Sequence, residues 1–178
     1  MEGGVDYEEF RWMDYEWFLA DASEQLAVLV TGGDGPVPSI LIGEKWVTES
    51  LCTLFGKSPD RGGYHLQTRD DFASDPSLPE KNFAGIEEYP IADDAKAQKS
   101  LKDWINYSRK GLFSYDWLDV HRPSIRRSRC YEMVSAPQRP ISLRDLPAEL
   151  AEKIPRVPTI RFNEARLLDV VGIFGGGV

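Results

Sequence analysis

The sequence predicts an α+β fold with a mainly antiparallel sheet of about five strands and two to three helices packed on it. Two apolar runs of strand length flank a polar turn near the N-terminus, and amphipathic helical stripes follow. The order hairpin, helix, long connection, helix, hairpin, helix, strand also lacks the regular alternation of a doubly wound fold. With 178 residues and 42% hydrophobic composition, residues 1–178 can bury a core as a single domain.

The first elements are predicted between residues 15 and 38. Residues 15–20 and 26–30 alternate as two strands around the polar turn 21–25. Both faces are apolar, so we place this hairpin in the sheet interior with helices over one side. A glycine- and proline-rich loop around Gly32–Gly35 ends the second strand. The preceding residues 6–14 are compatible with a short helix or an irregular lead-in.

A first helix is expected after this loop, with Ser39 as its N-cap and Gly56 at the C′ position. Its apolar stripe has helical spacing and consists of Val47, Leu51, Leu54 and Phe55. Residues 57–94 follow as a long loop-rich connection that we expect to hold a short strand at residues 64–66. The rest of this connection is either an ordered surface loop or a mobile lid.

A second helix is predicted to begin at Asp93 or Asp94 and to stop at Gly111, with an apolar stripe of Ala97, Leu101, Trp104 and Ile105. Residues 113–117 then alternate as a strand with one aromatic face. A loop leads to a further strand at residues 129–135, and the two can pair as an antiparallel hairpin.

The C-terminal part begins with a turn or polyproline segment at residues 136–140. Ser142 and Asp145 have capping-box spacing ahead of a short third helix with Leu146, Leu150 and Ile154 on one side. Residues 159–162 and 166–171 are predicted as one or two final strands, and residues 175–177 as a frayed end.

Charge is distributed unevenly along the chain. The first 50 residues carry eleven acidic and two basic side chains, a net charge of −9, whereas the remaining 128 residues sum to +1. Such a field repels phosphate backbones and attracts basic partners, so nucleic acid is an unlikely ligand for this region. A solvated surface that keeps the protein soluble is the alternative.

Composition also limits the chemistry and the compartment. The longest aliphatic run is residues 26–30, and the N-terminus is acidic where a secretory signal is basic, so we expect a cytoplasmic protein without a membrane span. Cys52 and Cys130 lack the spacing of a metal or redox site. With His65 and His121 as the two histidines, no metal and no cofactor are expected.

Each motif that resembles a catalytic or binding signature has a structural alternative. The Gly32–Gly35 loop is placed as a phosphate loop would be but lacks GxGxxG and GK[ST], so a structural corner is favoured. The carboxylate pairs Asp70–Asp71, Glu87–Glu88 and Asp93–Asp94 fit solvated loops better than acid–base pairs. A thiol, a histidine and an acid could form a nucleophile site, but no local signature supports one.

A short basic cluster stands out in the otherwise acidic chain, comprising Arg122, Arg126, Arg127 and Arg129 beside the aromatic Trp117 and Tyr131. Arginine with aromatic side chains is a combination that RNA-binding faces use. Pairing with the acidic N-terminal region is the interpretation we favour.

Aromatic side chains stand among the acidic ones at the N-terminus, and this combination suits a hot spot for a basic protein surface. The predicted partner-binding residues are Glu8, Glu9, Phe10, Trp12, Asp14, Glu16 and Asp34.

The segments WFLAD, LAVLVTGGDGPVP, KGLFSYDW and RPISLRDLPAEL resemble a group of small uncharacterised bacterial proteins. Some of these are similar to the immunity proteins of polymorphic toxin systems, which are acidic and cytoplasmic and neutralise a toxin by binding it. The resemblance carries no site residues, because the shared segments mark strands, turns and caps.

The leading hypothesis is therefore an acidic, cytoplasmic protein-binding module rather than an enzyme, and specifically an immunity-type inhibitor of a basic toxin or effector. The alternative is a small-ligand-binding protein or enzyme with a pocket beside the Gly32–Gly35 loop. In that case, a pocket in which a histidine meets a carboxylate and a thiol would favour chemistry.

Overall fold

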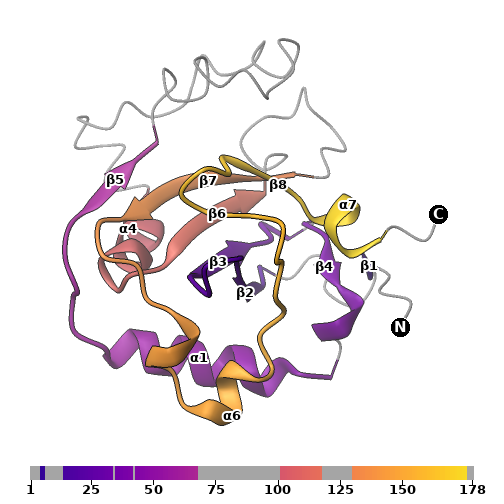
Figure 1. The fold of residues 1–178 in the computed structure, drawn as a ribbon, viewed down its shortest axis with the longest axis horizontal. Helices are drawn as coiled ribbons and strands as arrows, with labels where there is room; N and C mark the ends of the chain where they lie inside the picture. Colours follow the sequence, from indigo (N-terminus) through magenta and orange to yellow (C-terminus); the bar gives the residue numbers. More distant parts are fainter. Residues whose placement is uncertain are drawn as a thin grey trace.

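The structure is a computed structural model that describes residues 5–6, 14–33, 35–41, 43–67, 101–117 and 130–175. Its main sheet has six strands in the order β2-β3-β6-β7-β5, with β8 also paired to β7, and it curls into a half-barrel (Figure 1). The strands of this sheet are β2 (Glu16–Ala20), β3 (Leu26–Val30), β5 (Tyr64–Leu66), β6 (Phe113–Trp117), β7 (Cys130–Pro137) and β8 (Leu167–Asp169).

Two very short strands, β1 (Val5–Asp6) and β4 (Val37–Pro38), form a separate antiparallel pair. The helices are α1 (Lys45–Lys57), α4 (Lys102–Arg109), α6 (Ala148–Ala151) and α7 (Val170–Phe174), with 3-10 turns η1 (Ser39–Leu41) and η4 (Leu143–Asp145). None of these described helices combines the length and the apolar composition that crossing a membrane requires.

The predicted α+β class with a mainly antiparallel sheet is confirmed. All pairs in the sheet are antiparallel except β3 with β6, which run parallel. The hairpin of β2 and β3 also forms as predicted, but its placement in the sheet interior is wrong for β2, which stands first in the strand order. β2 is nevertheless buried along most of its length, because other segments cover both of its faces.

The turn between β2 and β3 is fixed by the buried Asp21. Its carboxylate accepts hydrogen bonds from the backbone N–H groups of Ser23 and Gln25 at 2.8 and 2.9 Å, and Glu24 adopts φ 61°. The second oxygen accepts from the backbone N–H of Phe162 at 2.9 Å, which docks the C-terminal segment onto the hairpin. One acidic residue of the N-terminal region is therefore structural.

The alternating strand residues separate into two apolar layers. One face carries the predicted aromatic row of β6 and packs under β4, β8 and α7, with Trp17, Leu29, Tyr115, Trp117 and Tyr131 among its residues. Within it the hydroxyl of Tyr131 accepts from Trp17 Nε1 at 3.2 Å and donates to the Pro36 carbonyl at 3.0 Å. The other face is covered by α1 and α6, which lie side by side in Figure 1.

The first helix begins later and ends later than predicted. Ser39 opens the 3-10 turn η1 rather than capping α1, because Gly43 at φ 84° separates the two helices. Gly56 was expected at the C′ position but lies inside α1, which ends at Lys57.

The second helix ends as predicted, in α4 followed by Gly111 at φ 97°. Its expected start at Asp93 or Asp94 and most of the 57–94 connection lie outside the described residues. The short strand predicted in that connection is confirmed as β5.

The C-terminal part differs most from the expectation. The Ser142–Asp145 capping box is present, but it starts the 3-10 turn η4, and the third helix is the single turn α6. Residues 159–162 form no strand, and only Leu167–Asp169 pairs with the sheet, as β8. Residues 170–171 were expected in a strand but begin α7, where the Asp169 carboxylate accepts from the Gly172 N–H at 2.8 Å.

Strand β7 carries partners on both edges. β6 pairs with one edge through a β-bulge, because Ser114 pairs with Ser135 while Tyr115 pairs with Met133. β5 and β8 lie end to end along the other edge, opposite residues 135–137 and 130–132. The ladder continues between them, with Gln67 N–H bonded to Val134 O at 3.0 Å and Met133 N–H bonded to Arg166 O at 2.8 Å.

The close approach at Gly35 gives a test of this packing. A Cβ at Gly35 would lie 2.6 Å from the Tyr131 hydroxyl and 2.9 Å from both the Cα and the carbonyl oxygen of Thr31. Since backbone would have to move, we expect Gly35→Ala to lower the free energy of unfolding by about 1–3 kcal/mol in urea denaturation.

Gly56→Ala is the matched control, because a Cβ there meets nothing within 4 Å. A helix favours alanine over glycine, so this variant should gain up to about 0.5 kcal/mol. Equal effects of the two substitutions would contradict the packing described for Gly35.

Candidate functional site

The structure describes two of the seven predicted partner-binding residues. Asp14 is exposed and Glu16 is half-buried, so these two do not share one solvated acidic face. The other predicted partner-binding residues lie outside the described part: Glu8, Glu9, Phe10, Trp12 and Asp34. Their role stays a prediction.

Glu16 belongs to a half-buried polar cluster between β2 and two helices. Its Oε2 accepts a hydrogen bond from the Tyr107 hydroxyl at 2.5 Å and one from the Cys52 thiol at 3.1 Å. The cluster lines a cavity of about 430 Å³ between α1 and α4, to which Asp60, Asp103, Asn106 and Lys110 also contribute. The Glu16 carboxylate thus joins β2 to both helices.

The protonation of this cluster follows from its surroundings. Burial, together with the hydrogen bond to Glu16 and the negative charge of Glu16, raises the pKa of Cys52 to about 12. Burial and the bond to Glu16 likewise raise the pKa of Tyr107. Cys52 is therefore a protonated hydrogen-bond donor near neutral pH and a poor nucleophile.

Other acidic side chains of the first 50 residues also have partners within the chain. Glu24 pairs with Arg144 at 2.8 Å, and Glu44 pairs with Lys153 at 2.8 Å. Surface pairs of this kind are screened by solvent and add little to stability. The basic partners come from the C-terminal part, and the arginine cluster at residues 122–129 lies outside the described residues.

Two exposed apolar side chains lie close to Glu44 along the chain. Among the described residues, two large hydrophobic side chains are exposed, Ile40 by 58% and Trp46 by 45%. They flank the turn between η1 and α1, and Glu44 and the exposed Glu49 lie within one helical turn of Trp46 along the chain. We call Ile40, Glu44, Trp46 and Glu49 the Trp46 surface.

The Trp46 surface was not among the predicted partner-binding residues, although the sequence held a signal for it. Trp46 stands outside the helical stripe that begins at Val47, so it could not share the buried side of α1. An aromatic residue off the apolar stripe of an amphipathic helix indicates an exposed position.

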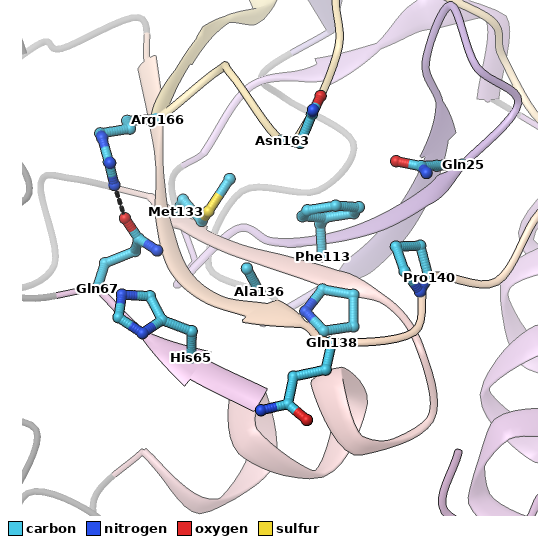
Figure 2. Close-up of a pocket in the computed structure, with 11 residues that line it drawn as sticks. Gln25, His65, Gln67, Phe113, Met133, Ala136, Gln138, Pro140, Asn163 and Arg166 are labelled. Atoms are coloured by element: carbon cyan, nitrogen blue, oxygen red, sulfur yellow. Dashed lines mark hydrogen bonds between the residues drawn. The ribbon is translucent and has the colours of Figure 1, made fainter. Parts of the chain in front are cut away.

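A second pocket of about 340 Å³ lies at the junction of β5 and β8 (Figure 2). Its apolar wall includes the buried Phe113 and Met133 together with Ala136, and Pro137 and Pro140 border it. Its polar groups are side-chain amides, one imidazole and one guanidinium, from Gln25, His65, Gln67, Gln138, Asn163 and Arg166.

Neither of the two pockets formed by described residues brings together a histidine, a thiol and an acid. His65 lines the pocket of Figure 2, whose described lining residues include no cysteine, aspartate or glutamate. Cys52 lines the cavity between α1 and α4 instead. The predicted alternative with His121 lies outside the described residues, and neither Cys52 nor Cys130 forms a disulfide.

The described part of the Gly32–Gly35 loop is a tight corner. Gly32 and Gly33 have φ 54° and 93°, and the Gly35 N–H donates to the Thr31 carbonyl at 2.8 Å. The Pro36 carbonyl accepts a hydrogen bond from the Tyr131 hydroxyl. This loop lines neither of the two pockets described above, so the ligand pocket expected beside it is not among them.

Strand register creates a carboxylate pair that the sequence analysis missed. Asp116 on β6 lies directly opposite Glu132 on β7, and both are buried. The pairs that adjacent sequence positions suggested, at residues 70–71, 87–88 and 93–94, lie outside the described residues. Only the register of the two strands, unknown from sequence, reveals this pair.

In the described ranges no three histidine, cysteine, aspartate or glutamate side chains come together as metal ligands would. Comparison with protein-family models, curated proteins and solved structures gave no match. The geometry and charge of this chain are therefore the basis on which we infer its function.

The Glu16 cluster makes the reactivity of Cys52 a measurable quantity. We expect Glu16→Gln to lower the pKa of Cys52, because the substitution removes the nearby negative charge. A fall of about one pKa unit raises the thiolate fraction about tenfold. The rate of iodoacetamide alkylation measures this change when it is followed by mass spectrometry between about pH 7 and about pH 10. Cys130 is the internal control.

The same shift affects stability. The pKa of Cys52 is higher in the folded chain than its ordinary value of 9.0, so the folded state holds the proton more tightly. The corresponding stabilisation is present below pH 9.0 and is lost as the pH rises toward about 12. Alkylation of Cys52 in the folded protein as fast as in the unfolded chain would contradict this account.

Proposed function

We propose that this protein is a protein-binding module that engages a basic partner, such as a toxin or effector domain, in the manner of an immunity-type inhibitor. The observation that carries the proposal is the Trp46 surface. The two exposed large hydrophobic side chains of the described residues, Ile40 and Trp46, both lie within the acidic first 50 residues. Exposed tryptophan with neighbouring charge is typical of interface hot spots.

The side chain of Trp46 is held in place before any partner binds. Its indole N–H donates to Glu44 Oε2 at 2.6 Å, and the Lys153 ammonium donates to Glu44 Oε1 at 2.8 Å. A tryptophan fixed in this way loses little conformational freedom on binding. This supports a role for Trp46 as a preformed anchor.

Charge favours a basic partner. Residues 1–50 carry a net charge of −9, which attracts a positively charged protein and accelerates its association. Asp21, Glu16, Glu24 and Glu44 are engaged within the chain, so we assign this attraction to the other acidic residues of the region. Asp14 and Glu49 belong to that set and are exposed.

Site-specific photo-crosslinking in the native host tests the proposal. A photoreactive phenylalanine analogue in place of Trp46 should crosslink to one basic protein, and the same analogue in place of the exposed Glu164 should not. With that partner purified, we expect Trp46→Ala to weaken binding about 30-fold or more, as a hot-spot anchor does.

Salt dependence separates charge from apolar contact. The affinity should fall with ionic strength, and the double variant Asp14→Lys, Glu49→Lys should flatten that dependence. Glu164→Ala serves as the matched control and should bind as the unchanged protein does. The proposal fails if position 46 crosslinks no protein, or if the captured protein is acidic and binds equally well after Trp46→Ala.

A further inference from the structure

The pocket at the β5–β8 junction is built by a break in an edge strand. Gln67 is the last described residue of the segment that contains β5, and it bonds to Val134; Arg166, just before β8, accepts from the next residue of β7, Met133. An unbroken strand would join these two positions by a peptide bond. The break places two polar side chains over the apolar wall (Figure 2).

Gln67 is oriented by its neighbour. Arg166 Nη1 donates a hydrogen bond to Gln67 Oε1, and the Gln67 side chain is 4% exposed. Because the oxygen is used in this bond, the amide nitrogen faces away from Arg166, as Figure 2 shows. Gln67 thus presents a positioned donor at the base of the pocket.

Three further residues with side-chain amides line the same pocket. Gln25 comes from the β2–β3 turn, Gln138 follows the end of β7 and Asn163 comes from the C-terminal segment. In Figure 2 the amide of Gln138 points away from Phe113 and Met133. Within the described residues, none of these three side-chain amides has a hydrogen-bond partner in the protein. Each can present a carbonyl acceptor and an NH₂ donor side by side.

The charge of the lining narrows the ligand class. The described lining residues include Arg166 but no lysine and no carboxylate, in a chain with 29 acidic residues. A cationic ligand would find no counter-charge here, whereas a neutral or anionic ligand meets no repulsion. Phe113, Met133 and Ala136 supply an apolar wall for a flat ring.

We propose that this pocket binds a planar heterocycle with hydrogen-bonding groups on its edge, of the nucleobase class. A side-chain amide matches the adjacent donor and acceptor of a base edge in a bidentate manner, and apolar side chains accept the face of the ring. The cavity of about 340 Å³ is at the small end of ligand pockets and has the size for such a group. This proposal is independent of the Trp46 surface.

Titration of the whole chain followed by backbone NMR tests the proposal. The probes are adenosine, guanosine, cytidine and uridine. N-acetylglucosamine, a sugar, and lysine, a cation, are control ligands of different chemistry. We expect at least one nucleoside to shift the amide resonances of β5 and residues 163–167 saturably, with a Kd below about 1 mM. A nucleoside monophosphate and a single-stranded oligonucleotide then show whether the base comes from a free nucleotide or from a strand.

Two variants and a control assign the binding to the amides. Gln67→Glu keeps a partner for Arg166 but removes the amide donor, and Asn163→Ala changes an exposed side chain, so both should fold and both should weaken binding about tenfold. Asn106→Ala, an exposed amide in the other cavity, should leave binding unchanged. The proposal is overturned if no nucleoside or nucleotide binds, or if N-acetylglucosamine binds as tightly as the nucleosides. It is also overturned if both pocket variants bind the nucleoside as tightly as the unchanged protein does.

Discussion

The fold depends on the backbone hydrogen bonds of β7, which pairs along both edges. β6 lies on one side, and the short strands β5 and β8 share the other, so segments from three parts of the chain meet on one strand. The bulge at Val134 turns the strand, with Val134 packing toward α4 and Met133 toward the opposite layer. The apolar wall of the pocket at the β5–β8 junction and the curl of the sheet both follow from this arrangement.

The two proposed binding features lie on different parts of this framework. The Trp46 surface stands at the start of α1, where Glu44 fixes the indole, and it belongs to the acidic region. The pocket at the β5–β8 junction has no acidic lining residue in the described part and is bordered by neutral amides. Opposite electrostatic character separates a surface for basic proteins from a pocket for uncharged or anionic ligands.

Local patterns predicted the elements whose partners are close in sequence. The β2–β3 hairpin, the aromatic row of β6 and the capping box at Ser142 all arise from spacing within a few residues. The parallel pairing of β3 with β6 and the bond from Tyr107 to Glu16 join positions far apart, which no local pattern encodes. The pocket was missed for the same reason, since its amides carry no motif and meet only through strand register.

Native-state hydrogen exchange tests most directly whether β7 organises the fold through one continuous ladder. The amides of Gln67 and Met133, which close the junction between β5 and β8, should exchange only with global unfolding, as slowly as the amides shared by β6 and β7. Exchange of these two amides at the rate of an exposed loop, with the β6–β7 amides still protected, would contradict the account.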